Sequence, residues 1–246
     1  MTRDCICLIL AAGQGTRMKS GLAKVLHPLC GKPLVEHVVR SAQKAGVDQT
    51  IVVVGHQADK VKKALAGVSV QFVMQQPQKG TGHAVMQVLL IIEKFDGQLL
   101  VLYGDVPLIK PETLKALLEK HQTEQNACTM LTTIIDQPGS YGRIIRDQNG
   151  SVSRIVEAKD ASSRELAVKE INPAIYAFDN RELVKALGQL KPNNKQGEYY
   201  LTDVIGIFKS KGMKIATQIV TDSREVLGIN TPEELAECEK YLSKMV

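Results

Sequence analysis

A glycine-rich turn near the start of the chain is the first stretch whose residues could do chemistry. Gly13 and Gly15 follow an apolar run that ends in Ala11 and Ala12. Small residues let a ligand approach the backbone closely, and successive N–H groups of such a turn can cradle an anion. The charged residues between Asp4 and Glu36 are all cations: Arg17, Lys19, Lys24 and Lys32. A phosphate-binding turn is the favoured interpretation, and the alternative is a tight surface turn with solvated lysines.

This turn fits neither of two common phosphate-binding motifs. A dinucleotide-binding fingerprint needs a third glycine at the position of Met18. A P-loop ending at Gly31 and Lys32 would need glycine at Leu26 and Ser or Thr in place of Pro33. What remains is a strand followed by AAGQGTRM, which still points to phosphate.

Two further stretches could contribute to a site. Asp105 follows a predicted buried strand and could bind Mg²⁺, which takes one or two protein oxygens together with phosphates and water. Gly80-Thr81-Gly82 leads into a predicted helix whose first N–H groups could face a ligand. Each signal is weak alone. A lone Asp after a strand is usually a turn or cap residue, and an ordinary helix start capped by Thr81 is the simpler interpretation of the second stretch.

Alternating strand and helix patterns would position these residues. Apolar, β-rich runs predict buried strands at 5–11, 50–55, 70–74 and 98–104. Helical patterns lie between them at 33–46, 59–67 and 81–95. Such alternation implies an α/β fold with a mostly parallel sheet covered on both faces. Open sheets of this kind bind ligands at the carboxyl ends of their strands, where the glycine-rich turn falls.

The second half of the chain is less regular. Strands are predicted at 127–135, 142–147, 151–157, 172–178 and 214–220, with a turn at 148–150. Helices are predicted at 180–189, 199–211 and 231–246, the last capped by Thr231 with Pro232 at its first position. One α/β domain with a β-rich insertion is the simplest interpretation.

Composition excludes several classes of protein. The 246 residues carry a net charge of +5, no tryptophan and no basic tract interleaved with aromatics, so nucleic-acid binding is not expected. No run approaches the roughly 20 apolar residues of a membrane span. The five cysteines form no C-x-x-C pair, and Cys5 and Cys7 are predicted to be buried on one face of a strand. A soluble cytoplasmic protein without membrane association is expected.

Taken together, the motifs are far more specific than any one of them. LAAGQGTRM, KVLH, GTGHA, LYGDVPL, YGRI, IVEAKD, GEYYLTDV and GIN occur in this order between residues 6 and 230. In this the chain resembles the sugar-1-phosphate nucleotidylyltransferases, and within them the uridylyltransferase domains of the N-acetylglucosamine-1-phosphate uridylyltransferases. The resemblance implies a Rossmann-like three-layer domain. It also implies Mg²⁺-dependent transfer of a uridylyl group from UTP to N-acetylglucosamine 1-phosphate, which releases pyrophosphate.

The resemblance also implies roles for particular residues. Arg17 and Lys24 would be catalytic contacts to phosphates, and Asp105 and Asn230 would bind Mg²⁺. Gly142, Glu157 and Asn172 would hold the sugar. The nucleotide would be bound by Leu10, Ala11, Ala12, Gly13, Gly15, Gln75, Gly80, Thr81, Tyr103 and Gly104. Glu198, Tyr200 and Asp203 lie in a family motif but are taken as structural, and His83 as a helix-start histidine.

Two positions depart from the family pattern. Ala23 replaces a usual proline before Lys24, which loosens the loop slightly. Pro173 and Ala174 replace a small residue and a glycine after Asn172; proline lacks an N–H, and alanine adds a Cβ where a ligand would come close. Transfer to another sugar 1-phosphate or from another nucleotide is therefore the main alternative. A non-catalytic nucleotide-sugar-binding module is a weaker one.

The expected domain organisation is a nucleotidylyltransferase domain at 1–230 followed by a C-terminal helix at 231–246. The chain contains no hexapeptide repeat of the kind that forms a β-helical acetyltransferase domain. Either a truncated or a natural single-domain enzyme would fit, and the oligomeric state is left open.

Overall fold

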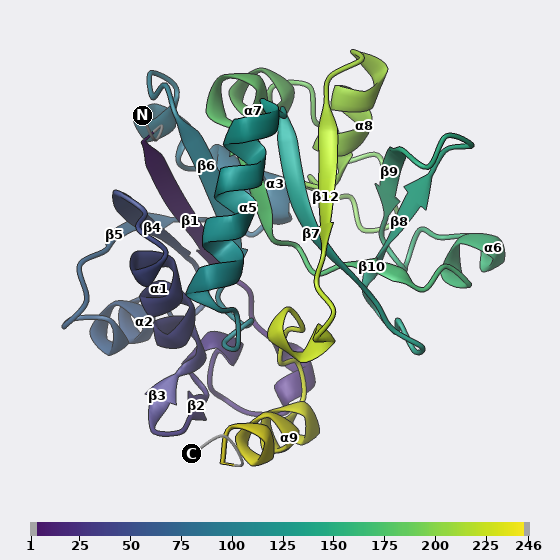
Figure 1. The fold of residues 1–246 in the computed structure, drawn as a ribbon. Coiled ribbons are helices and arrows are strands. Elements are labelled where there is room, and N and C mark those ends of the chain that lie inside the picture. Colours follow the sequence, from purple (N-terminus) through teal and green to yellow (C-terminus); the bar gives the residue numbers. More distant parts are fainter. Residues whose placement is uncertain (1–3, 244–246) are drawn as a thin grey trace.

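A ten-stranded mixed sheet forms the middle layer of the computed structural model, which describes residues 4–243 (Figure 1). Four parallel strands lie side by side in the order β5 (Gln71–Met74), β4 (Gln49–Val54), β1 (Cys5–Ala11) and β6 (Gln98–Tyr103). Next to β6 lies β11 (Tyr176–Asp179), which is antiparallel to β6 and to β7 (Cys128–Ile134). On its other edge β7 pairs with the parallel strand β12 (Ile215–Ile219). The predicted α/β fold with a mostly parallel mixed sheet is confirmed.

The predicted β-rich insertion continues from the carboxyl end of β7. There β10 (Glu170–Asn172) pairs with β7 and with β8 (Gly142–Arg146), and β8 pairs with β9 (Val152–Val156), all antiparallel. Gly150, with φ of 77°, lies in the turn between β8 and β9. The short helix α6 (Ser163–Leu166) joins β9 to β10 and lies beside this hairpin on the right in Figure 1.

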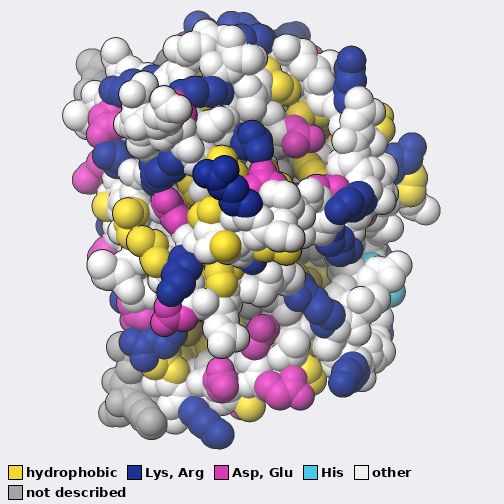
Figure 2. Space-filling view, turned by 90° about the vertical axis from the view of Figure 1, so that its right-hand side faces the viewer, with side chains coloured by type: hydrophobic (Ala, Val, Ile, Leu, Met, Phe, Trp, Pro, Cys, Tyr) yellow, Lys and Arg dark blue, Asp and Glu magenta, His cyan; other side chains and the backbone are white. Residues whose placement is uncertain are grey.

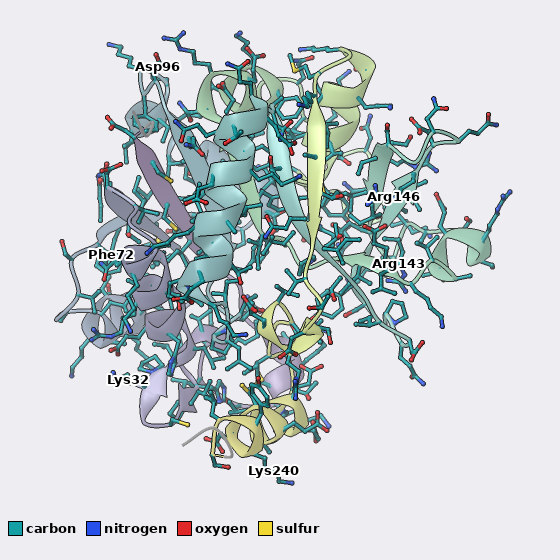
Figure 3. The ribbon with its side chains drawn as sticks, viewed as in Figure 1. Lys32, Phe72, Asp96, Arg143, Arg146 and Lys240 are labelled. Atoms are coloured by element: carbon teal, nitrogen blue, oxygen red, sulfur yellow. The ribbon has the colours of Figure 1, made fainter. Side chains whose placement is uncertain are left out.

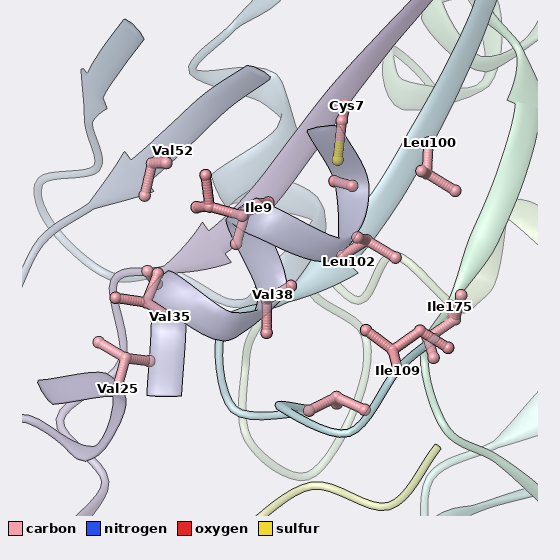
Figure 4. Packing of buried hydrophobic residues seen from close by; sticks show 14 of the residues in the cluster. Cys7, Ile9, Val25, Val35, Val38, Val52, Leu100, Leu102, Ile109 and Ile175 are labelled. Atoms are coloured by element: carbon pink, nitrogen blue, oxygen red, sulfur yellow. The ribbon is translucent and has the colours of Figure 1, made fainter. Parts of the chain in front are cut away.

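Helices cover both faces of the sheet. One face packs against α1 (Leu34–Lys44), α2 (Ala58–Ala64) and α5 (Pro111–Glu124). The other packs against α3 (Thr81–Met86), α4 (Leu89–Ile92), α7 (Asn180–Leu187) and α8 (Asp203–Ser210). Successive residues of β1 alternate between the two cores. Ile9 packs in the first core with Val38 (Figure 4), and Leu8 belongs to the second. Two buried faces explain why β1 is apolar throughout.

The C-terminal helix α9 (Pro232–Ser243) packs below the sheet on a small hairpin, β2 (Pro28–Leu29) and β3 (Lys32–Pro33). Leu29, Ile229 and Cys238 form the buried contact. The predicted cap is present, because the Glu234 N–H donates to Thr231 Oγ1 at 3.2 Å. Residues 244–246 of the predicted helix lie outside the described residues.

Two predicted helices were wrong in extent. The helix at 81–95 is divided between α3 and α4, because hydrogen bonds from Val88 N to Val85 O and from Ile91 N to Val88 O tighten the chain there. The helix at 199–211 begins only at Asp203. The residues before it pair with another segment: Tyr199 N donates to Lys79 O at 2.9 Å, and Gly82 N donates to Tyr199 O at 2.8 Å.

Two further differences concern the second half of the chain. The single strand at 172–178 is in fact β10 and β11, separated by Pro173, which has no N–H, and by Ala174, whose φ is 63°. Helix α5 was not predicted, although Pro111 at its first position and leucines at 114, 117 and 118 are a recognisable signal.

Charged side chains of both signs are interspersed on the face that carries the β8–β9 hairpin (Figure 2). Among residues 4–243, no helix combines the length and apolar character that a bilayer crossing requires.

Candidate active site

Two adjoining cavities, of about 280 and 290 Å³, open at the carboxyl ends of β1 and β6. We call the one beside the glycine-rich turn the glycine-loop cavity and the one beside β8 and β10 the insertion cavity. They have five lining residues in common: Lys24, Thr81, Tyr103, Asp105 and Glu198. They are therefore two lobes of one cleft, and Lys24 and Asp105 stand where the lobes meet.

The glycine-loop cavity is formed largely by backbone and small side chains. Its lining includes eight of the residues predicted to hold the nucleotide: Leu10, Ala11, Ala12, Gly13, Gln75, Gly80, Thr81 and Tyr103. The side chain of Gln75 is 3% exposed, and its Nε2 donates to Gly80 O at 3.0 Å, so the amide is fixed against the wall.

The wall at residues 80–82 is held by the segment that precedes α8. Gly80 has a φ of 100°, and a Cβ there would lie 2.6 Å from Tyr199 O. The predicted capping role of Thr81 is wrong, because Gly80 is the cap residue of α3 and Thr81 Oγ1 instead accepts a hydrogen bond from Leu201 N at 3.0 Å. This close pairing requires glycine at position 80 and fixes the Thr81 side chain.

A cluster of four charged and polar side chains lies at the meeting of the lobes, and we call it the junction cluster. Lys24 forms a short ion pair with Asp105, and its Nζ donates to Asn230 Oδ1 at 3.0 Å. Arg17 donates to the same Asn230 oxygen at 2.8 Å and to Ser140 Oγ at 3.0 Å. Three distant parts of the chain thus bring together two cationic side chains and two side chains with oxygen atoms that could bind a metal.

Two of the glycines predicted to bind the nucleotide, Gly15 and Gly104, pack against the segment that carries Lys24. A Cβ on Gly15, whose φ is 69°, would lie 2.3 Å from Lys24 Cβ. Gly104 is packed less closely, because a Cβ there would lie 3.1 Å from Val25. Neither glycine lines either cavity. Their positions indicate a packing role, and the ligand contact predicted for them stays a prediction.

The insertion cavity contains all three residues predicted to hold a sugar. Gly142 begins β8, Glu157 follows β9 and Asn172 ends β10. Asn172 is 5% exposed; its Nδ2 donates to Tyr176 OH at 2.6 Å, and its Oδ1 accepts from Ala174 N at 3.1 Å. The Glu157 carboxylate accepts from Thr202 Oγ1 at 3.1 Å. The cavity therefore presents a fixed amide and a fixed carboxylate.

Electrostatics in the insertion cavity favour the protonated form of Glu157. Burial raises the pKa of Glu157, the Thr202 hydroxyl opposes this, and the nearby Asp203, Asp160 and Glu198 raise it further. Burial also raises the pKa of Tyr200 to about 12. An uncharged or weakly anionic ligand surface with hydroxyl groups suits such a lobe better than a phosphate does.

Asp105 and Asn230 provide the hard oxygen donors that Mg²⁺ prefers. Gly228 lies against this pair, since a Cβ there would come within 3.2 Å of Asp105 Oδ2. In the described part of the chain, no group of three or more His, Cys, Asp or Glu side chains is arranged to hold a metal. The donor set fits an ion that takes one or two protein oxygens and completes its shell with phosphates and water.

Several lining residues were missed by sequence reasoning. Ser140 and Tyr141 reach the junction cluster from the loop before β8, and Tyr141 OH both accepts from Gly228 N at 2.9 Å and donates to Gly228 O at 3.3 Å. The loop itself is held by Arg143 of β8, which donates to Gly139 O at 3.1 Å and lies on the insertion in Figure 3. The YGRI motif was the available signal.

Other predicted structural roles are partly supported. Glu198 and Tyr200, taken as structural, line the insertion cavity. His83 is held at the start of α3, with its ring nitrogens 3.2 Å from the amides of Gln75 and Gln87. Burial lowers its pKa, which favours the neutral ring.

The fold and the cleft define a class. A Rossmann-like sheet with a glycine-rich turn after β1, facing basic side chains and an oxygen-donor pair, is the architecture of a nucleotidyltransferase. Residues 7–203 match the MobA-like NTP transferase domain, and the chain belongs to that family.

Curated relatives support the same class. The chain is 49% identical over 239 residues to the bifunctional protein GlmU of Brevibacillus brevis, covering 97% of this chain and 52% of the relative. It is 47% identical over 244 residues to the bifunctional protein GlmU of Acetivibrio thermocellus, covering 99% and 53%. The chain thus spans about half the length of the curated relatives that it matches.

Solved structures share the fold. A UDP-glucose pyrophosphorylase complexed with UDP-glucose aligns over 100% of both chains with a TM-score of 0.78 and 21% identity. A putative glucose-1-phosphate thymidylyltransferase from Bacillus anthracis aligns over 96% of this chain and 94% of its own with a TM-score of 0.77 and 19% identity. At these identities the likeness concerns the fold.

Proposed function

We propose that the chain transfers the uridylyl group of UTP to N-acetylglucosamine 1-phosphate, with Mg²⁺, giving UDP-N-acetylglucosamine and pyrophosphate. The junction cluster carries this proposal. Arg17, Lys24, Asp105 and Asn230 meet between a lobe of backbone and small side chains and a lobe with a fixed amide and carboxylate. Phosphates of two substrates, one bound in each lobe, would come together at this point.

The nucleotide would occupy the glycine-loop cavity. Gln75 and the backbone at Gly80 would contact the base, and the backbone from Leu10 to Gly13 would lie along the ribose and phosphates. Small residues suit this role because they allow close approach of the backbone.

The sugar would occupy the insertion cavity. Asn172 and Glu157 offer the amide and carboxylate that an acetamido group and sugar hydroxyls need as hydrogen-bond partners. The motifs that resemble the N-acetylglucosamine-1-phosphate uridylyltransferases support a hexosamine substrate.

In the transfer, a phosphate oxygen of the sugar phosphate attacks the α-phosphorus of UTP. A new P–O bond forms, the bond from the α-phosphorus to the bridging oxygen breaks, and pyrophosphate leaves with the electron pair. The nucleophile is already an anion, so its activation needs no strong base. The protein contributes in-line positioning and neutralisation of charge.

Two cationic side chains would supply that neutralisation. Arg17 presents a planar fork suited to a phosphate, and Lys24 presents a point charge. Asp105 and Asn230 would hold Mg²⁺, which screens repulsion between the two anionic substrates. Lys24 Nζ lies between these two oxygens in the structure. We expect it to turn toward phosphate when both ligands bind.

A substrate panel tests the proposal. Nucleotide-sugar products of the chain are identified by mass spectrometry for UTP and other triphosphates with N-acetylglucosamine, glucosamine, glucose and galactose 1-phosphates. We expect UTP and N-acetylglucosamine 1-phosphate to be strongly preferred. Products with other pairs alone would reject this substrate assignment.

The second candidate function is transfer to a different sugar 1-phosphate. It is favoured by Pro173 and Ala174, which both line the insertion cavity. Ala174 is also tied to the predicted sugar ligand Asn172, since Ala174 N donates to Asn172 Oδ1 at 3.1 Å. The same panel distinguishes the two candidates.

A further inference from the structure

We propose that Gln57 is a positioning residue for Lys24, acting through the backbone of residues 21–23; the catalytic part of this inference rests on the proposed function. Gln57 Nε2 donates to Gly21 O at 2.7 Å, and Gln57 Oε1 accepts from Ala23 N at 3.1 Å. One side-chain amide thus uses its donor and its acceptor on the segment that leads directly into Lys24.

The backbone of Gln57 is itself fixed. Gln57 is the N-cap residue of α2 with φ of 52°, and Lys60 N donates to Gln57 O at 2.9 Å. The preceding residue is tied to the glycine-rich turn, since His56 N donates to Ala12 O at 3.0 Å. Gln57 therefore connects the end of β4 and the glycine-rich turn to the segment that carries Lys24.

Lys24 is confined from the opposite side as well. It begins the short 3-10 helix η2 (Lys24–Leu26), and Gly15 packs so closely that a Cβ there would collide with Lys24 Cβ. Ala23 is fully buried and Val25 nearly so, which anchors the residues that flank Lys24. The Gln57 amide completes this confinement at the start of η2.

The hydrogen bond from Ala23 N to Gln57 Oε1 can order position 23 in place of a proline ring. Ala23 has φ of −57°, within the range that a proline ring imposes. Alanine does not restrict this torsion, but it supplies the backbone N–H that donates to Gln57 Oε1. Proline would fix φ covalently and remove that N–H. The Gln57–Ala23 bond and a proline at position 23 are therefore alternative ways to order the Lys24 segment.

The test is a double-mutant cycle with Q57A, A23P and Q57A/A23P, read by pyrophosphate release and by hydrogen exchange of residues 20–27. Q57A is expected to lower kcat/KM for UTP about tenfold, the effect of one to two hydrogen bonds, and to speed exchange at 20–27. In the A23P background, Q57A is expected to lower kcat/KM for UTP only about twofold.

Control variants separate this role from general stability. Q71A removes another surface amide contact, to Gln49 at 2.8 Å, and is expected to match the wild type in both readouts. Q57E keeps the acceptor for Ala23 N but loses the donor to Gly21 O, so an intermediate loss is expected.

Two results would overturn the proposal: unchanged exchange at 20–27 in Q57A, or an equal loss of activity with and without A23P. If the wild type releases no pyrophosphate, the proposed function fails. The exchange data still decide whether Gln57 orders the segment. If Q57A does not fold, Q57E, which removes only the hydrogen bond to Gly21 O, is read by the same exchange and activity measurements, and unchanged exchange at 20–27 in Q57E would then overturn the proposal.

Discussion

Lys24 lines both lobes of the cleft. Its ammonium contacts Asp105 and Asn230, and its side chain is 20% exposed, so it faces the cleft while remaining partly shielded from solvent. Partial burial strengthens the attraction between such charges relative to a fully exposed pair. The junction cluster is therefore both preorganised and accessible to phosphate.

Replacing Asp105 tests the metal assignment. D105N keeps the size of the side chain but removes the negative charge that would hold Mg²⁺. We expect pyrophosphate release to fall at least about hundredfold, while circular dichroism shows a retained fold. D59N, on the exposed surface of α2, is the matched control. A D105N rate equal to wild type would reject the role of Asp105.

Glu157 should make stability depend on pH. Because burial raises its pKa, the folded protein keeps this proton to a higher pH than the unfolded chain does. The stabilisation present at low pH is therefore lost as pH rises from the ordinary carboxyl pKa through the raised one. We expect E157Q to lack this loss and to gain stability relative to wild type across that interval.

Thermal melts of wild type and E157Q between pH 4 and 8 provide the measurement, with E119Q on α5 as the control. E157Q should also raise the KM for the sugar phosphate about tenfold, because one carboxyl oxygen that could accept from a sugar hydroxyl is replaced by an amide NH2. Parallel pH profiles of wild type and E157Q would contradict the buried-carboxyl account.

Ala174 carries backbone strain at the sugar lobe. Its φ of 63° costs an L-residue roughly 1–2 kcal/mol, whereas glycine accepts it at a smaller entropic cost. We expect A174G to raise the free energy of unfolding by roughly 0.5–1 kcal/mol in urea titrations. A236G, on the surface of α9, should lower it by about 1 kcal/mol. A destabilised A174G would contradict this.

At the scale of elements, the start of α9 positions Asn230. The Glu234 carboxylate accepts from Asn230 N at 2.6 Å and from Thr231 N at 3.2 Å, which orders the turn that carries Asn230, the proposed metal ligand. Tyr141 holds Gly228 from the other side. A capping box thus also serves as the support of a site residue.

E234A should disturb this support. We expect the Mg²⁺ concentration for half-maximal pyrophosphate release to rise several-fold, with a loss of about 1 kcal/mol in stability. E239A, exposed on the same helix, is the control. If E234A lowers stability without changing the Mg²⁺ requirement, α9 does not position Asn230.

Sequence patterns predicted the elements whose signals are local. Strands β1 and β6 lie where they were predicted, because burial on both faces makes such strands apolar. The glycine-rich turn and Asp105, which directly follow these strands, are placed with them. The prediction of a helix at residues 199–202 was wrong. These residues pair with residues 79–82 instead, and that pairing depends on the tertiary fold. Ser140, Tyr141 and Gln57 act through contacts distant in sequence, which no spacing encodes.

At the scale of the whole molecule, one cleft is assembled from both halves of the chain. The glycine-loop cavity comes from the parallel strands, and the insertion cavity comes mainly from the β-rich insertion and the residues around it. The sheet brings them together at the end of β6, and α9 closes the junction through Asn230. Such a division would allow the residues of the insertion cavity to change while those of the glycine-loop cavity stay the same.

Under the proposed function, uridylyl transfer requires a substrate in each lobe and a bound Mg²⁺. The most direct measurement is pyrophosphate release with UTP and N-acetylglucosamine 1-phosphate, compared with reactions lacking either substrate and with EDTA in place of Mg²⁺. We expect release in the complete reaction, and none above background when any component is missing. Release from UTP alone, or undiminished release with EDTA, would contradict it.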